Sequence, residues 1–123
     1  MNDPDAFARD WIEAWNARDL ERILSHYAEE IVFESPGVRQ LMNDPTGRVV
    51  GKAALRAYWA KALARLPDLH FELRDVFVGV DGCAIRFWSR AAAGEVVEVL
   101  VFGPDGLVVN SAAYRAKPEV RRP

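Results

Sequence analysis

The second half of the chain constrains the fold most, because it divides into four strand-like segments separated by short turns. The segments are residues 70–80, 83–91, 95–102 and 107–116, and they are rich in β-branched and aromatic residues, which suit a pleated sheet. The separators contain the turn-forming pair Asp81-Gly82, residues 92–94 and the sequence GPDG. Four consecutive strands with tight turns predict an antiparallel meander.

A helix is expected near the start of the chain. Asn2 or Asp3 can cap it, and Pro4 suits the first turn, where its missing N–H costs no hydrogen bond. The large aromatic residues that follow recur at helical spacing and predict one aromatic stripe, made of Phe7, Trp11 and Trp15.

Two further helices and a short strand complete the first half. A short helix is expected after Asp19, with a buried face of Leu20, Ile23, Leu24 and Tyr27, and a β-branched strand follows at 31–34. Residues 35–51 contain three glycines and two prolines, which predict a long loop of the kind that often serves function. A third helix is expected at 52–66, ended by Pro67. Helices followed by strands predict one α+β domain over residues 1–123, with the helices covering one face of a curved sheet.

Composition excludes several classes of function. Sixteen Lys and Arg against eighteen Asp and Glu give a formal charge of -2, without the basic excess that nucleic acid binding requires. No apolar run reaches the ~20 residues that span a bilayer, and the polar, acidic start is unlike a signal peptide, so we expect no membrane partner and a cytoplasmic location. The single Cys83 allows no internal disulfide and is expected in the core.

The sequence contains no motif for binding a metal or an organic cofactor. His26 and His70 have no third ligand at a suitable spacing and are expected at a helix surface and a strand edge. The chain has no Gly-rich phosphate loop, no GxSxG and no CxxC, so neither metal nor organic cofactor is expected.

An acidic residue inside the strand at 95–102 is the strongest candidate for chemistry. Glu95 and Glu98 are three residues apart, so they must point to opposite faces of the sheet. Turn lengths predict that Glu98 lies opposite Ser111 on one neighbouring strand and opposite Trp88 on the other. Glu98 could then pair at the sheet surface with one of two diagonal arginines, Arg86 or Arg90. Alternatively, it could project into a cavity beside the aromatic stripe, where loss of water would raise its pKa.

The same strand is apolar on both faces, which an antiparallel sheet with one wet face does not need. Something must cover the second face. A second copy of the same sheet is the simplest cover, so we expect a twofold homodimer.

Three stretches carry a resemblance to a known family: WIEAWNARDLERILSHYAEEIVFESPG, GKAALRAYWAKAL and VEVLVFGPDGLVVNSAAY. Together they resemble the nuclear transport factor 2-like superfamily, in particular its SnoaL-like and ketosteroid isomerase-like branches. The resemblance covers nearly the whole chain. It implies a cone-shaped α+β fold, with three N-terminal helices on a curved antiparallel sheet, a deep apolar pocket and usually a homodimer.

The resemblance also suggests roles for individual residues. Glu98 falls where the ketosteroid isomerases keep a protonated aspartic acid in the oxyanion hole. Ser35 falls where that family has its proton-transferring aspartate, and Trp11 replaces the tyrosine that completes the oxyanion hole. Tyr27 matches a tyrosine of the second helix, and Trp59 stands where one branch has a supporting tyrosine. Without a carboxylate at position 35, the ordinary steroid isomerase mechanism lacks its base.

Three classes of function remain. Two of them use the expected pocket, and the third applies if the pocket is filled. The first is an isomerase- or cyclase-type enzyme that moves protons on an apolar carbonyl compound, with Glu98 as its catalytic acid, and Asp75 as a second acid if its side chain points inward. The second is a non-catalytic binding module for a hydrophobic small molecule, and the third is a dimerisation domain with a filled pocket. A cavity of roughly 300 Å³ or more at Glu98 would favour the first two. The expected substrate contacts are Trp11, Trp15, Tyr27, Ser35, Trp59, Trp88 and Ser111.

Overall fold

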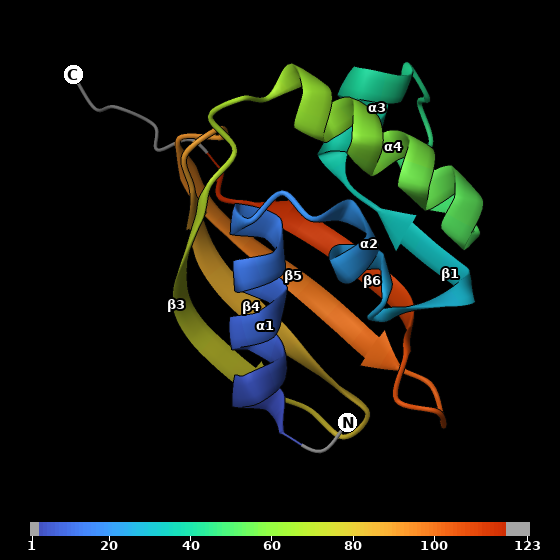
Figure 1. Cartoon of the computed structure of the whole chain (residues 1–123), viewed down its shortest axis with the longest axis vertical. Coiled ribbons are helices and arrows are strands. Elements are labelled where there is room, and N and C mark those ends of the chain that lie inside the picture. Colours follow the sequence, from blue (N-terminus) through green and yellow to red (C-terminus); the bar gives the residue numbers. More distant parts are fainter. Residues whose placement is uncertain (1–2, 118–123) are drawn as a thin grey trace.

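A computed structural model describes residues 3–117 as four helices and one six-stranded sheet (Figure 1). The helices are α1 (Pro4–Asn16), α2 (Leu20–Leu24), α3 (Pro36–Met42) and α4 (Lys52–Arg65). The strands are β1 (Tyr27–Glu34), β2 (Arg48–Val50), β3 (Phe71–Val78), β4 (Gly82–Ser89), β5 (Gly94–Phe102) and β6 (Val108–Arg115). This arrangement confirms the predicted α+β class.

The sheet has the strand order β2-β1-β6-β5-β4-β3. Strands β3 to β6 form the predicted antiparallel meander. The expectation of a wholly antiparallel sheet is wrong at one place, because β1 pairs with β6 in parallel, with Phe33 beside Ser111. Everything from α3 to β5 lies between these two strands in sequence, and this long connection lets the chain re-enter the sheet in the same direction.

The first helix begins as predicted. Asp3 is its N-cap, and its Oδ1 accepts hydrogen bonds from the backbone N–H groups of Asp5 and Ala6 at 3.0 and 3.2 Å. Asn2, the other candidate cap, lies outside the described residues. Trp11 and Trp15 of the stripe are buried against the sheet, and Phe7 is half-buried.

Two expectations for the first half of the chain are wrong. Residues 35–51 are not a plain loop, because they contain α3 and β2, which makes four helices instead of three. Ser35 caps α3 by accepting a 3.1 Å hydrogen bond from Gly37 N, and Pro36 occupies the first turn, where proline is tolerated. Tyr27 does not belong to the second helix but starts β1, because α2 ends at Leu24.

The register of β5 also differs from the expectation. Glu98 lies opposite Ile85 on β4 and Ala113 on β6, and not opposite Trp88 and Ser111. The turn before β5 has an even number of residues, because Ser89 pairs with Gly94, and a bulge shifts the pairing of β5 with β6 at Val101. The shift along β6 is two residues, so Ser111 stays on the same face as Glu98.

The sheet curves around α1, and α3 and α4 cover the other part of its concave face (Figure 1). Aromatic rings fill the space between them. Phe71 and Phe87 lie 4.3 Å apart between ring centroids, Trp15 and Trp59 lie 5.0 Å apart, and Trp11 stacks on Phe71 at 5.9 Å. Cys83 is buried in this core, as expected.

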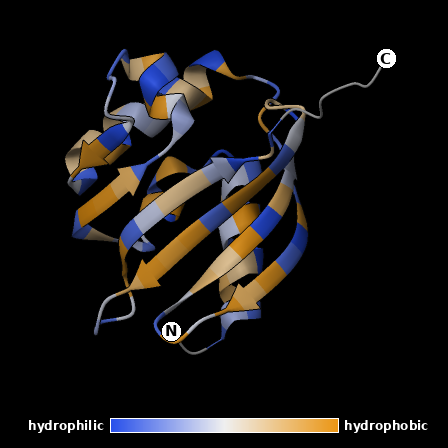
Figure 2. Cartoon of the chain, turned by 180° about the vertical axis from the view of Figure 1, so that it is seen from behind, coloured by the Kyte–Doolittle hydropathy of each residue, from blue (hydrophilic) through white to orange (hydrophobic). Residues whose placement is uncertain are grey.

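No helix of the described residues covers the opposite face of the sheet (Figure 2). Apolar side chains of β5 point to this outer face, since Val97, Val99 and Val101 alternate with inward residues. Phe77 and Tyr114 on other strands are more than half exposed. The outer face is therefore partly apolar and uncovered.

Candidate functional site

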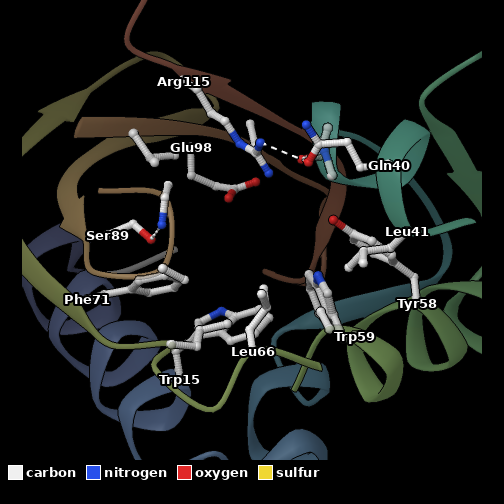
Figure 3. Close-up of a pocket in the computed structure, with 18 of the residues that line it drawn as sticks. Trp15, Gln40, Leu41, Tyr58, Trp59, Leu66, Phe71, Ser89, Glu98 and Arg115 are labelled. Atoms are coloured by element: carbon white, nitrogen blue, oxygen red, sulfur yellow. Dashed lines mark hydrogen bonds between the residues drawn. The ribbon is translucent and has the colours of Figure 1, made fainter. Parts of the chain in front are cut away.

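A cavity of about 220 Å³ opens between the concave face of the sheet and helices α1, α3 and α4 (Figure 3). It is somewhat smaller than the ~300 Å³ expected for a ligand pocket, which restricts it to small molecules. The main apolar walls are Trp15, Trp59, Leu66, Phe71 and Phe87. The polar groups that line it are Ser35, Gln40, Tyr58, Ser89, Glu98 and Arg115.

Glu98 is the carboxylic acid of this cavity. The side chain comes from the inner face of β5 and is only 5% exposed. Its Oε2 accepts a 2.9 Å hydrogen bond from the Ser111 hydroxyl on β6. Burial raises the pKa of Glu98 to about 8, although the Ser111 hydrogen bond lowers it. At neutral pH the neutral acid therefore predominates.

The alternative of an ion-paired Glu98 at the sheet surface is wrong. Within residues 3–117, neither Arg86 nor Arg90 forms an ion pair with it. Arg86 lies on the outer face and pairs with Asp75 at 3.2 Å and with Glu95 at 3.7 Å. The outward position of Asp75 also excludes it as a second acid of the cavity.

A line of buried polar side chains lies behind Glu98. The indole Nε1 of Trp11 donates a 2.9 Å hydrogen bond to the Tyr27 hydroxyl. Burial raises the pKa of Tyr27 well above its usual value, and the negative charge of an ionised Glu98 raises it further, whereas the Trp11 and Ser111 groups lower it. Tyr27 is therefore neutral. Of these residues, Ser111 holds Glu98 directly through its hydrogen bond, and Trp11, Tyr27 and Ser111 do not line the cavity.

The predicted contact residues divide into three groups. Trp15, Ser35 and Trp59 line the cavity together with Glu98. Trp11, Tyr27 and Ser111 lie behind its wall. The expectation that Trp88 contacts the substrate is wrong, because Trp88 follows the inward Phe87 on β4 and therefore points to the outer face, opposite Glu72 and Glu95.

Tyr58 and Arg115 were not predicted, yet both reach the cavity. Burial raises the pKa of Tyr58, while the Ser35 hydroxyl and the Arg115 charge lower it. Arg115 sits at the end of β6, where Ser111, Ala113 and Arg115 alternate along the inner face. That period of two is a signal in the sequence that would have placed Arg115 inward once Ser111 was placed there. Gln40, a third unpredicted residue, belongs to the unexpected helix α3.

One donor in the cavity wall has no partner among the described residues. The Nε1 of Trp15 is buried and makes no hydrogen bond there. Its indole nitrogen faces the cavity, across from the Glu98 carboxyl group (Figure 3). A ligand oxygen would satisfy it, since a buried N–H without an acceptor costs free energy.

The described part of the chain contains no group of three or more His, Cys, Asp and Glu that could hold a metal ion. His26 instead lies 2.7 Å from Asp10 Oδ2, beside the ring of Phe7. Between residues 3 and 117, no helix is long and apolar enough to cross a membrane.

Comparison with known proteins relates the whole domain to one family. The SnoaL-like domain family matches residues 8–111. A SnoaL-like protein of unknown function from Burkholderia thailandensis is 45% identical, with a TM-score of 0.87 over 93% of this chain and 94% of its own. None of the curated proteins matches this chain.

More distant structures share the fold alone. A proposed isomerase of the SnoaL-like family from Agrobacterium tumefaciens is 16% identical, with a TM-score of 0.73 over 95% of this chain and 100% of its own. A nuclear transport factor 2-like protein of unknown function from Burkholderia pseudomallei is 17% identical, with a TM-score of 0.76 over 94% and 92% of the two chains. These likenesses confirm the fold expected from the resemblance.

Proposed function

The chain belongs to the SnoaL-like domain family, and we propose that it is an isomerase- or cyclase-type enzyme that moves protons on a small apolar molecule with a carbonyl group. An ordinary steroid isomerase is not proposed, because Ser35 stands where that mechanism needs a carboxylate. Neither a metal nor an organic cofactor is part of the proposal.

One observation carries this proposal: an acid with no cationic partner among residues 3–117 is buried in a cavity with aromatic walls. A carboxyl group in such a place costs stability if it serves only packing. Its pKa of about 8 is close to neutral pH, so Glu98 can both give and take a proton under ordinary conditions. These properties are typical of a general acid-base residue.

The chemistry follows from the groups around the cavity. Ionised Glu98 would take a proton from the carbon next to the substrate carbonyl, and the electron pair of that C–H bond would move onto the carbonyl oxygen. The Trp15 indole N–H is a donor that can stabilise the resulting enolate. Protonated Glu98 would then return the proton to another carbon in an isomerisation. In a cyclisation, the enolate carbon would attack a second carbonyl, and Glu98 would protonate the new alkoxide.

A binding module for a hydrophobic small molecule is the second candidate. It is favoured by the lining residues, which include no carboxylate or histidine besides Glu98 to act as a separate base. A dimerisation domain with a filled pocket is not supported, because the cavity is open.

Exchange of carbon-bound protons tests the proposal without knowledge of the natural substrate. We expect the protein to exchange the α-protons of 1-indanone, a small aryl ketone, for deuterium, as followed by NMR. Glu98→Gln keeps the shape but cannot transfer a proton, so exchange should fall about 100-fold or more while 1-indanone affinity changes little. Glu95→Gln, on the outer face of the same strand, is the matched control. Retained exchange in Glu98→Gln would exclude the acid-base role. Binding of 1-indanone without any exchange by the wild type would favour the binding module.

We also propose that two copies pack through the outer face of the sheet. The partly apolar surface around Val99, which is 37% exposed, supports this arrangement. The cavity opens on the other face, so each copy would keep its own site.

A further inference from the structure

The mouth of the cavity carries a positive charge that its walls do not balance. The Arg115 guanidinium extends over the cavity toward α3 (Figure 3). Its Nη1 donates a 3.1 Å hydrogen bond to Gln40 Oε1, which is an uncharged amide oxygen. Among residues 3–117, no carboxylate lies within ion-pairing distance of this guanidinium. Arginine does not lose its proton in proteins, so the positive charge is permanent.

A glycine allows a second donor to approach the same place. A Cβ on Gly37 would lie 2.2 Å from the Tyr58 hydroxyl oxygen and 3.2 Å from Arg115 Nη2. Gly37 does not have a positive φ, so its backbone conformation alone would accept other residues. The missing side chain therefore matters for the space that it leaves, in which the phenol and the guanidinium come together.

These groups have the chemistry of an anion site. Gln40 uses Nη1 of Arg115, which leaves the N–H groups of Nη2 to bind a ligand. Tyr58 stays neutral because burial raises its pKa, so its O–H can donate as well. A guanidinium with a nearby hydroxyl suits a carboxylate, since charge-assisted hydrogen bonds are the stronger kind. Glu98 is neutral over most of the range below its pKa of about 8 and would not repel such an anion.

The geometry points to a carboxylate subsite at the cavity mouth, formed by Arg115 and the Tyr58 hydroxyl in the space beside Gly37. The ligand would then be a small apolar acid, with its carboxylate at Arg115 and its carbonyl group at Glu98. Trp15 and Phe71 would contact the apolar body between these ends. The inference rests on the proposed function in one respect, namely that the cavity is the ligand site.

Two probe molecules measure how much a negative charge on the ligand contributes to its affinity. 4-Acetylbenzoate and its methyl ester share one ring and one ketone, a size that suits a cavity of about 220 Å³, and only the first is an anion. Binding is followed by tryptophan fluorescence and by the indole N–H resonance of Trp15. At low salt, the wild type should bind the acid about tenfold or more tightly than the ester. This preference should shrink as salt is added.

Three variants test which residues cause the preference for the acid over the ester. Arg115→Gln should abolish it while the affinity for the ester stays within about twofold. Gly37→Ala should weaken acid binding by displacing the Tyr58 hydroxyl, again with little effect on the ester. The control Arg9→Gln removes an exposed arginine that does not line the cavity, and it should keep the preference.

The outcomes distinguish this inference from the proposed function. Equal binding of the two probes to the wild type, or a preference that survives Arg115→Gln, would overturn the carboxylate subsite and leave the cavity as a site for neutral carbonyl compounds. If neither probe binds, the subsite is overturned together with the proposed ligand site.

Discussion

At the scale of single residues, the environment of Glu98 opposes its charge. The surrounding walls are apolar and aromatic, and the main stabilising contact of the carboxylate is one hydrogen bond from Ser111. The proton that the folded protein keeps on Glu98 is lost at a much lower pH from an unfolded chain. The raised pKa that makes Glu98 useful as an acid therefore also makes the stability of the folded protein depend on pH.

This linkage predicts a pH-dependent difference between the wild type and Glu98→Gln. Between the ordinary pKa of 4.5 and about 8, the folded state holds a proton that the unfolded state has released. The contribution of Glu98 to stability is therefore complete below about pH 4.5 and is lost as the pH rises through about 8. Relative to Glu98→Gln, the wild type should lose a few kcal/mol of unfolding free energy across this range.

Urea unfolding of both proteins at a series of pH values measures this difference. Other titrating groups, such as Asp10 with its lowered pKa, are common to both proteins and cancel. Glu95→Gln, which changes an outward carboxylate on the same strand, should follow the wild type. Parallel pH profiles for the wild type and Glu98→Gln would mean that Glu98 titrates normally.

Sequence reasoning located the central residue of the site but not its surroundings. Glu98 could be placed because two glutamates three residues apart on a strand must face opposite ways, and Glu95 had access to water. Trp88 was misplaced because the turn between β4 and β5 has four residues, 90–93, instead of the expected three, 92–94. Arg115 could have been placed inward from the period that it shares with Ser111, but its approach to Tyr58 beside Gly37 appears only when α3, α4 and β6 are assembled.

At the scale of elements, long segments with clear periods were predictable and short ones were not. Helix α1 and strands β3 to β6 follow patterns that hold over eight or more residues. Helix α3 has seven residues and contains Pro36 and Gly37, which favour a loop in isolation. Its stability depends on tertiary packing and on the cap at Ser35, neither of which has a period in the sequence.

The cap gives a prediction for α3. Ser35→Ala removes the hydroxyl that accepts the hydrogen bond from Gly37 N, so we expect a loss of about 1 kcal/mol in unfolding free energy. In Ser35→Ala, the backbone amides of α3 should also exchange with solvent faster than they do in the wild type, when the amides of α1 serve as the reference. Ser35→Thr keeps a capping hydroxyl and should restore most of both quantities. Unchanged exchange in Ser35→Ala would show that packing alone holds α3.

At the scale of the whole molecule, the two faces of the sheet differ in what packs against them. The concave face packs on the helices and contains the cavity, whereas no helix within residues 3–117 lies over the outer face (Figure 2). Val99 lies near the middle of this face, on a strand with neighbours on both sides, and its inner neighbour in sequence is Glu98. A partner on the outer face would therefore stiffen the strand that carries the proposed acid.

If the dimer forms through this face, a single charged residue introduced at the centre of the face should dissociate it into monomers. Val99→Lys would bury a charged group at the interface with the partner, and the removal of that charge from water costs free energy. We expect sedimentation equilibrium to give twice the monomer mass for the wild type and the monomer mass for Val99→Lys at the same concentration. Val80→Lys, in the turn between β3 and β4, changes a fully exposed valine and should leave the wild-type mass. A stable dimer of this kind needs about 800 Å² of buried surface on each partner, so a wild type that sediments as a monomer would show that the outer face does not provide it.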